Sequence, residues 1–240
     1  MSARTQGPGV WGPRWSRWVG AFIAFVLYRT KVYGLRRIPR SGPVVLVANH
    51  SAFIDGPLVH GVVRGRGTHF LITRRMFSGP LGVILRGAGL IPVDETGRGA
   101  LASGLAVLRR GGVVGLFPEG TRGNGDITET QGGAAWLAVQ SGAAVVPVAI
   151  FGTRREGEKP SAWPPLWRRL HVAFGQPLQV ARPRGLKGAP LVRAAQDEIA
   201  AYLRAHVHTT SDAVGMAVLT DMPGGERALR RAEGGSSDDH

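Results

Sequence analysis

His50 and Asp55 have the residue types and the spacing of a catalytic pair. They belong to the segment Asn49-His-Ser-Ala-Phe-Ile-Asp55, which follows an apolar run at 44–48. Five positions correspond to about 140° around a helix, so the two side chains could meet only across a non-helical turn. Pro57 suits the first turn of a helix and leaves such a turn before it. Asp55 could then hold one ring nitrogen of His50 and make the other a general base, although a capping aspartate beside a surface histidine has the same spacing.

A second group of polar residues follows the apolar run at 113–117. Its members are Pro118, Glu119, Gly120, Thr121 and Arg122. Proline ends strand pairing, glycine permits a close approach to the backbone, and the planar guanidinium of arginine binds a phosphate through two hydrogen bonds. The group therefore indicates an anion site, although a charged surface turn would have a similar composition.

The chain contains no cysteine, which excludes disulfides, thiolate nucleophiles and Cys-based zinc sites. Its seven histidines are scattered, and His206 and His208 have no carboxylate at ligand spacing. We therefore expect no metal and no cofactor. Any covalent chemistry must come from another kind of side chain.

Short apolar runs alternate with amphipathic stretches after Pro39, and this alternation predicts an α/β fold. We expect strands at 44–48, 69–73, 90–93, 113–117, 145–150 and 170–174, and helices at 57–63, 80–86, 99–110, 133–140 and 191–207. The expected architecture is a single domain with a largely parallel or mixed central sheet flanked by helices. An N-terminal membrane-associating helical segment precedes it. Open sheets of this kind bind ligands at the carboxyl ends of their strands, which is where both polar groups fall.

The formal net charge of +14 is concentrated near the amino terminus. Residues 1–40 carry no carboxylate and eight basic residues: Arg4, Arg14, Arg17, Arg29, Lys31, Arg36, Arg37 and Arg40. The apolar stretch at 18–28 is too short to span a bilayer, which takes about 20 residues. Trp11 and Trp15 precede it, and this combination favours a helix in the membrane interface. An ordinary first helix packed on the core, or a nucleic-acid surface, are the alternatives.

The expected organisation has three parts. Residues 1–34 form the basic and apolar membrane-interface segment, residues 35–208 form the main domain, and residues 209–240 form a mobile tail. The tail is rich in Gly, Ser, Asp and charged residues without periodicity.

Four blocks in a fixed order resemble those of the glycerolipid acyltransferases, whose best-known members are the 1-acyl-sn-glycerol-3-phosphate acyltransferases. The blocks are Asn49-His50 with Asp55, then 89–94, then Phe-Pro-Glu-Gly-Thr-Arg at 117–122, then Val-Pro-Val at 146–148. The resemblance covers residues 35–180. It implies an acyltransferase that moves a fatty acyl group from acyl-CoA or acyl carrier protein to the hydroxyl of lysophosphatidic acid or a related lysolipid.

The resemblance also implies a role for individual residues. His50 would be the general base and Asp55 would orient it, while Pro147 and Val148 would lie on the acyl-chain side. The acceptor would be bound by Asn49, Glu119, Gly120, Thr121 and Arg122, with Arg122 on the phosphate.

One residue departs from the family pattern. Many members have an arginine directly after the second block, whereas this chain has Glu95. Arg98, or Arg74 and Arg75, could take over a phosphate contact; equally, the acceptor could be a different lysolipid. The expected partners are an anionic membrane surface, a lysophospholipid and the acyl donor, with no nucleic acid. The expected location is the cytoplasmic face of the membrane, with the protein peripheral or monotopic.

Overall fold

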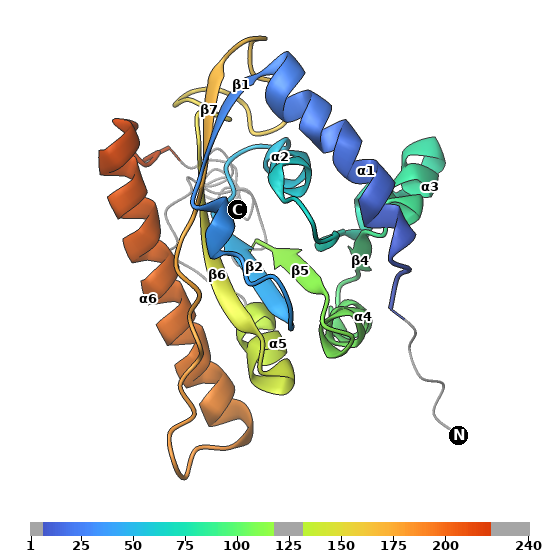
Figure 1. Ribbon diagram of the computed structural model, residues 1–240, viewed down its shortest axis with the longest axis vertical. Helices are drawn as coiled ribbons and strands as arrows, with labels where there is room; N and C mark the ends of the chain where they lie inside the picture. The colour runs from blue at the N-terminus through green and yellow to red at the C-terminus, as the bar shows by residue number, and fades with distance from the viewer. Residues whose placement is uncertain (1–6, 118–131, 222–240) are drawn as a thin grey trace, which may run out of the picture.

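The computed structural model describes residues 7–117 and 132–221, and its centre is one mixed seven-stranded sheet (Figure 1). The strand order is β1-β7-β6-β2-β5-β3-β4, and every neighbouring pair is parallel except β6 and β7. The strands are β1 (Arg29–Tyr33), β2 (Val44–Ala48), β3 (Thr68–Thr73), β4 (Ile91–Val93), β5 (Val113–Leu116), β6 (Ala144–Phe151) and β7 (Arg169–Phe174). The predicted α/β architecture is confirmed.

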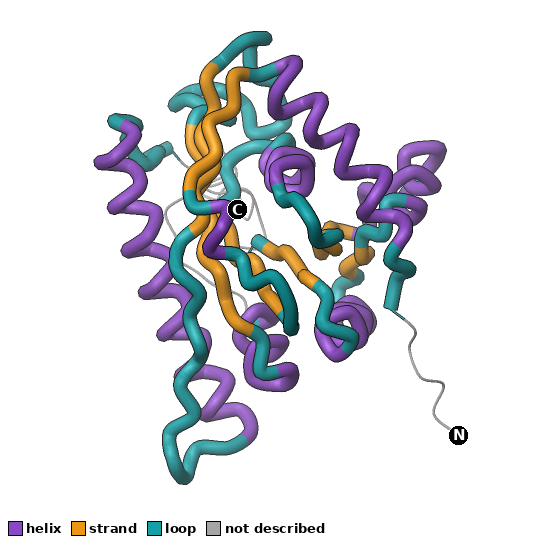
Figure 2. Tube along the Cα trace, in the orientation of Figure 1, coloured by secondary structure: helices purple, strands orange, loops and turns teal. Residues whose placement is uncertain are grey.

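Helices cover both faces of the sheet (Figure 2). They are α1 (Trp11–Phe22), α2 (Asp55–Val62), α3 (Gly79–Gly87), α4 (Arg98–Arg109), α5 (Gly133–Ser141) and α6 (Gly188–Val214), with a π-helical turn η1 (Ile23–Leu27) after α1. Alternation along β2 explains the two layers: Val45 and Val47 face the core under α4, α5 and α6, whereas Val44 and Leu46 face the core under α2 and η1.

The amino-terminal segment is part of the domain. Helix α1 lies across α2, where a Cβ added to Gly61 would lie 2.0 Å from the carbonyl carbon of Gly20. The chain then enters the sheet as β1, which pairs with β7 and was not predicted. Helix α1 and β1 therefore pack against the rest of the domain, while association of the segment 1–34 with a membrane stays a prediction.

The opposite face of α1 is exposed and apolar. Its large exposed side chains, together with those of η1, are Trp11, Trp15, Trp18, Val19, Phe22, Phe25 and Val26. No helix among residues 7–117 and 132–221 is long and apolar enough to cross a membrane. Contact of this face with lipid stays a prediction.

A buried polar chain joins α1 to the domain. The Ser16 hydroxyl is 2.8 Å from His60 Nε2, and His60 Nδ1 is 2.7 Å from the Thr68 hydroxyl. Burial, helped by the nearby charges of His69 and Arg17, lowers the pKa of His60 from 6.5 to about 4. His60 is therefore neutral at physiological pH, and the sequence offered no sign of this network.

The carboxyl-terminal helix continues past the predicted end at residue 207. It reaches Val214, and Gly215, with φ +66°, ends it in the left-handed conformation. Met216 and Val218 then pack against the core cluster between the sheet and α6. A tail beginning at residue 209 was therefore predicted too early, because the mostly polar residues 209–214 continue the helix, and Thr210 is buried and donates its hydroxyl to the His206 carbonyl at 2.7 Å.

Candidate active site

The carboxyl ends of β2, β5 and β6 meet at one edge of the sheet. β2 pairs in parallel with β5 on one side and with β6 on the other. His50 follows β2, Phe117 follows β5, and Gly152 follows β6, so the two predicted groups of polar residues, at 49–55 and 117–122, follow neighbouring strands. This is the edge at which open α/β sheets bind ligands.

His50 and Asp55 meet as predicted. Residues 49–54 form a non-helical turn, and α2 begins at Asp55. His50 Nδ1 lies 3.0 Å from Asp55 Oδ2, with the histidine side chain 15% exposed and the carboxylate fully buried. An ionised Asp55 accepts a hydrogen bond from the Nδ1–H group, so Nε2 is the ring nitrogen that can take a proton from a substrate.

The turn itself holds the Asp55 carboxylate in place. The backbone N–H groups of Ser51 and Ala52 each donate to Oδ2 at 2.8 Å, so this oxygen receives three hydrogen bonds. Oδ1 is buried and, within the described part of the chain, has no hydrogen-bond partner. Because three donors converge on one oxygen, the orientation of His50 depends on the backbone of the turn as well as on Asp55.

Phe117 forms an aromatic wall beside the histidine. Its ring stacks on His50 at 4.0 Å between centroids, with 19° between the planes, and lies 5.7 Å from Phe70. The stack restricts the imidazole to one plane and shields one face of it from water. Sequence reasoning placed Phe117 in the motif but not against His50, because this contact depends on β5 lying next to β2.

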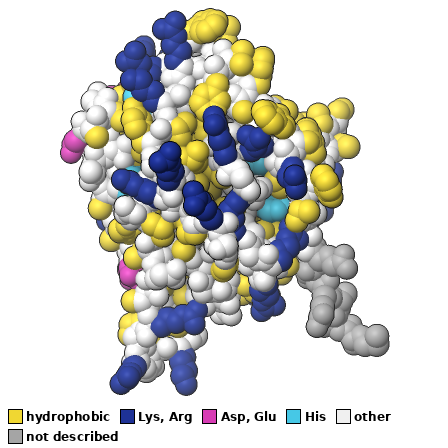
Figure 3. Space-filling view, viewed as in Figure 1, with side chains coloured by type: hydrophobic (Ala, Val, Ile, Leu, Met, Phe, Trp, Pro, Cys, Tyr) yellow, Lys and Arg dark blue, Asp and Glu magenta, His cyan; other side chains and the backbone are white. Residues whose placement is uncertain are grey.

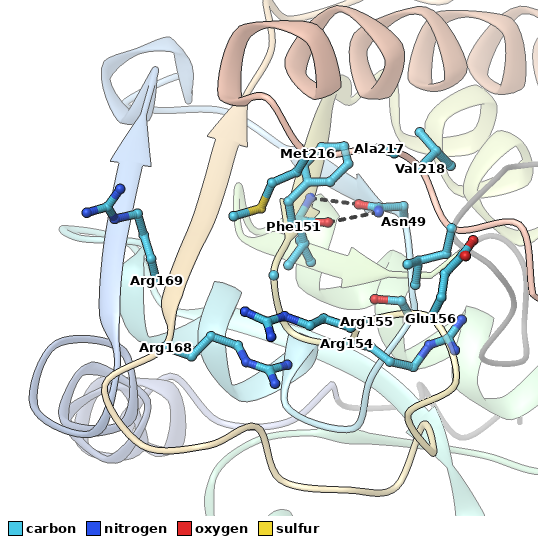
Figure 4. Close-up of a pocket in the computed structure, with 14 residues that line it drawn as sticks. Asn49, Phe151, Arg154, Arg155, Glu156, Arg168, Arg169, Met216, Ala217 and Val218 are labelled. Atoms are coloured by element: carbon cyan, nitrogen blue, oxygen red, sulfur yellow. Dashed lines mark hydrogen bonds between the residues drawn. The ribbon is translucent and has the colours of Figure 1, made fainter.

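Asn49 braces the turn against β6. Its amide nitrogen donates to the Ile150 carbonyl at 3.0 Å, and its amide oxygen accepts from the Ile150 N–H at 2.8 Å (Figure 4). Asn49 is buried, and both of its polar atoms are used in these bonds. The structure thus gives it a positioning contact, while its predicted contact with substrate stays a prediction.

The predicted arginines are spread along the edge. Arg74 and Arg75 follow β3, and Arg98 begins α4 after β4; all three are exposed. β3 is two strands away from β2, about 10 Å at the usual strand spacing of about 4.8 Å, and contact of these arginines with a substrate phosphate stays a prediction. Hydrogen bonds from Thr96 and Gly97 lower the pKa of Asp94, and the charge of Arg74 adds to the effect. Glu119, Gly120, Thr121 and Arg122 lie outside the described residues.

Pro147 and Val148 lie inside β6, before its carboxyl end. Both are buried, and Val148 belongs to the core cluster under α2. The Pro147 carbonyl accepts the N–H of Gly175 at 2.8 Å. Their role on the acyl-chain side stays a prediction.

A cavity of about 250 Å³ lies beside the turn at residues 49–54 (Figure 4). Asn49 and Ser51 line it, but His50 does not. Buried Arg154 and partly exposed Asp221 form an ion pair there at 2.6 Å, which fastens the segment after α6 over the carboxyl end of β6. The sequence did not point to this pair, because its members are 67 positions apart. No group of three metal-ligating side chains occurs in the described parts of the chain.

Comparison with known proteins gives consistent similarities. A family model described as Acyltransferase matches residues 29–151. Human 1-acyl-sn-glycerol-3-phosphate acyltransferase beta is 32% identical over 136 residues, which are 54% of this chain and 49% of that protein. A Bacillus subtilis 1-acyl-sn-glycerol-3-phosphate acyltransferase is 26% identical over 156 residues, 63% of this chain and 74% of that protein. The matched segment thus spans about half the length of the human relative.

The fold also has a counterpart among solved structures. The crystal structure of the 1-acyl-sn-glycerophosphate acyltransferase PlsC from Thermotoga maritima aligns with a TM-score of 0.64. The alignment covers 83% of this chain and 79% of that one, at 20% sequence identity. At this identity the comparison shows a shared fold.

Proposed function

Because the chain belongs to the acyltransferase family, we propose that it transfers a fatty acyl group from an acyl thioester to the free hydroxyl of lysophosphatidic acid or a related lysolipid. The donor is acyl-CoA or acyl carrier protein, and the product is phosphatidic acid or the corresponding diacyl lipid. The observation that carries this proposal is the His50–Asp55 pair, a buried carboxylate 3.0 Å from an imidazole at the carboxyl edge of the sheet.

The reaction is a direct transfer. His50 Nε2 takes the proton of the acceptor hydroxyl while that oxygen attacks the thioester carbonyl carbon. The tetrahedral intermediate collapses with cleavage of the carbon–sulfur bond, and the imidazolium returns the proton to the leaving thiolate. Asp55 stabilises the imidazolium between these two steps. No acyl-enzyme forms, which accords with a chain that has no cysteine.

The proposed place of this reaction is a membrane surface. On helix α1, two arginines stack over tryptophan rings. The Arg17 guanidinium lies 4.3 Å from the ring centre of Trp18, and the Arg14 guanidinium lies 5.2 Å from that of Trp11. Tryptophan with adjacent arginine suits the head-group region of an anionic bilayer, where each basic residue contributes about 1 kcal/mol. The cytoplasmic leaflet, which is the anionic one, stays the proposed side.

An acceptor assay tests the activity. Purified protein is incubated with oleoyl-CoA or oleoyl-acyl carrier protein and a panel of lysolipids that differ in head group, beside a His50→Ala variant. We expect acyl transfer that falls about 10² to 10⁴-fold in the variant while its circular dichroism is unchanged. Transfer to a lysolipid other than lysophosphatidic acid would change the substrate but keep the mechanism. Lysolipid binding without turnover on every donor would instead indicate a non-catalytic lipid-binding protein.

A further inference from the structure

The loop between β6 and β7 has an apolar tip. Three large side chains within five positions, Trp163, Leu166 and Trp167, are more than half exposed. We propose that this tip inserts into the same anionic lipid surface as α1. It would thereby hold the catalytic turn, the turn at residues 49–54 that carries His50, at the bilayer. The inference rests on the proposed function, and it adds a second membrane contact that is separate in sequence from α1.

Trp167, in the apolar tip, combines an unusual backbone conformation with an exposed side chain. Trp167 has φ +66° and is the only non-glycine residue with a positive φ among residues 7–117 and 132–221. This conformation costs about 1–2 kcal/mol in an L-residue. The Trp167 N–H donates to the Leu27 carbonyl at 2.8 Å and helps to hold it there. Trp167 remains 63% exposed, so burial in the protein interior does not account for the conformation.

The tip is continuous with the exposed face of α1. Leu27 ends η1, which continues α1, and the next residue, Tyr28, donates its hydroxyl to the Pro164 carbonyl at 3.0 Å. The Arg29 guanidinium lies 5.9 Å from the ring centre of Trp167. Figures 1 and 2 show the loop beside the carboxyl-terminal end of this helix. Hydrophobic side chains extend along this side of the molecule with Lys and Arg among them (Figure 3).

Charge favours lipid over an apolar protein partner. Three exposed basic residues lie close to the tip in contact, register or sequence: Arg29 over the Trp167 ring, Arg169 opposite Arg29, and Lys159 earlier in the same loop. The carboxylate of Glu158 is already bound by the guanidinium of Arg168 at 2.7 Å. Indoles with a positive rim match the interface of an anionic bilayer, where the rings reach the acyl chains and the guanidinium groups meet phosphates. Exposed apolar clusters rimmed by polar groups are typical of such contact sites.

The loop also contacts the catalytic turn directly. Phe53, between His50 and Asp55 in the sequence, donates its N–H to the Pro160 carbonyl at 2.9 Å. The ring of Trp163 lies edge-on to that of Phe53 at 5.9 Å. Insertion of the tip would therefore place His50 next to the lipid surface, so that a lysolipid hydroxyl could reach the base while its acyl chain stays in the bilayer.

Single cysteines can test the tip, because the chain has none of its own. Leu166→Cys, Val19→Cys on α1 and Leu186→Cys are each labelled with an environment-sensitive fluorophore. Leu186 is an exposed leucine in the loop before α6, at the far end of the molecule in Figure 1, and serves as the matched control. Iodide quenching is measured with and without vesicles of phosphatidylglycerol and phosphatidylcholine.

We expect vesicles to protect the labels at positions 166 and 19 severalfold and to leave the label at 186 open to iodide. Protection at 19 without protection at 166 would overturn this inference and leave membrane-bound acyl transfer intact. Protection at neither position would overturn the membrane part of the proposed function too. A label at 166 that is shielded before vesicles are added would point to a second copy of the chain and would also overturn the lipid contact.

A substitution provides the second measurement. Leu166→Asp should weaken vesicle binding by about tenfold or more, the equivalent of exposing one leucine side chain and adding a charge that anionic lipid repels. Leu186→Asp, the matched control, should bind as the unaltered chain does. Equal binding by both variants would contradict insertion of the tip.

Discussion

Acid should loosen the contact between α1 and the domain through His60. The ring is buried between Ser16 of α1 and Thr68 of β3, and its pKa is about 4 instead of 6.5. Between these two values the unfolded chain carries a proton on His60 that the folded chain does not. Stability therefore falls as the pH is lowered from 6.5 towards 4, and it is unaffected by His60 above this window.

The size of the effect follows from the same two values. The pKa of His60 differs between the unfolded chain, at 6.5, and the folded chain, at about 4. At about 1.4 kcal/mol per unit of pKa, this difference lowers the free energy of unfolding by about 3 kcal/mol once the pH has fallen through both values. This is a large fraction of the about 5–15 kcal/mol that stabilises a typical domain. Since His69, His171 and His206 also have pKa values lowered by burial, the wild-type protein alone cannot isolate the contribution of His60.

A His60→Gln variant isolates it. Glutamine has hydrogen-bonding groups and does not titrate, so the variant should lose less stability than the wild type as the pH falls. Urea unfolding of both proteins, followed by circular dichroism from pH 7.5 to 4.5, gives the two free-energy curves. Parallel curves over this range would refute the reasoning, and so would an NMR titration that placed the pKa of the His60 ring near 6.5.

Three further outcomes follow from particular contacts. Gly61→Ala should cost more than about 2 kcal/mol of unfolding free energy, because its Cβ would overlap the backbone of α1. Gly99→Ala on α4 is its control: no atom lies within 4 Å of the added Cβ, so thermal or urea unfolding of this variant should show an unchanged or higher stability. Asp55→Asn should lower kcat about 10² to 10⁴-fold with little change in the melting temperature, and a fully active variant would exclude the dyad. Asp221→Asn should weaken the pairing of buried Arg154 and increase amide exchange over residues 215–221, whereas unchanged exchange would show that the ion pair does not hold this segment.

The strands of the sheet centre could be predicted because each is a run of β-branched and aliphatic residues buried on both faces. β1 could not, since Arg29–Tyr33 alternates exposed and half-buried side chains at the sheet edge and contains no apolar run. The last turns of α6 were missed for a related reason, because residues 208–212 are a run of polar side chains without an apolar pattern.

The site divides in a similar way. His50 and Asp55 are close in sequence and share one turn, so their meeting could be predicted from spacing and Pro57. The stack of Phe117 on His50 and the brace from Asn49 to Ile150 depend on strand order, which local sequence does not determine. The apolar tip at residues 163–167 lies in a loop without periodicity, so only its position beside η1 and Phe53 reveals a common surface.

The pairing of β1 with β7 has a consequence for synthesis of the chain. Arg29 lies opposite Arg169 in the register, so the ribosome delivers β1 140 residues before its partner. At about 5–20 residues per second, β1 waits for about 7–30 seconds without the strand that completes its place in the sheet. Throughout that interval the helix before it is tethered to an unpaired strand, so the surface that carries its tryptophans is available to a nearby bilayer before the sheet is complete.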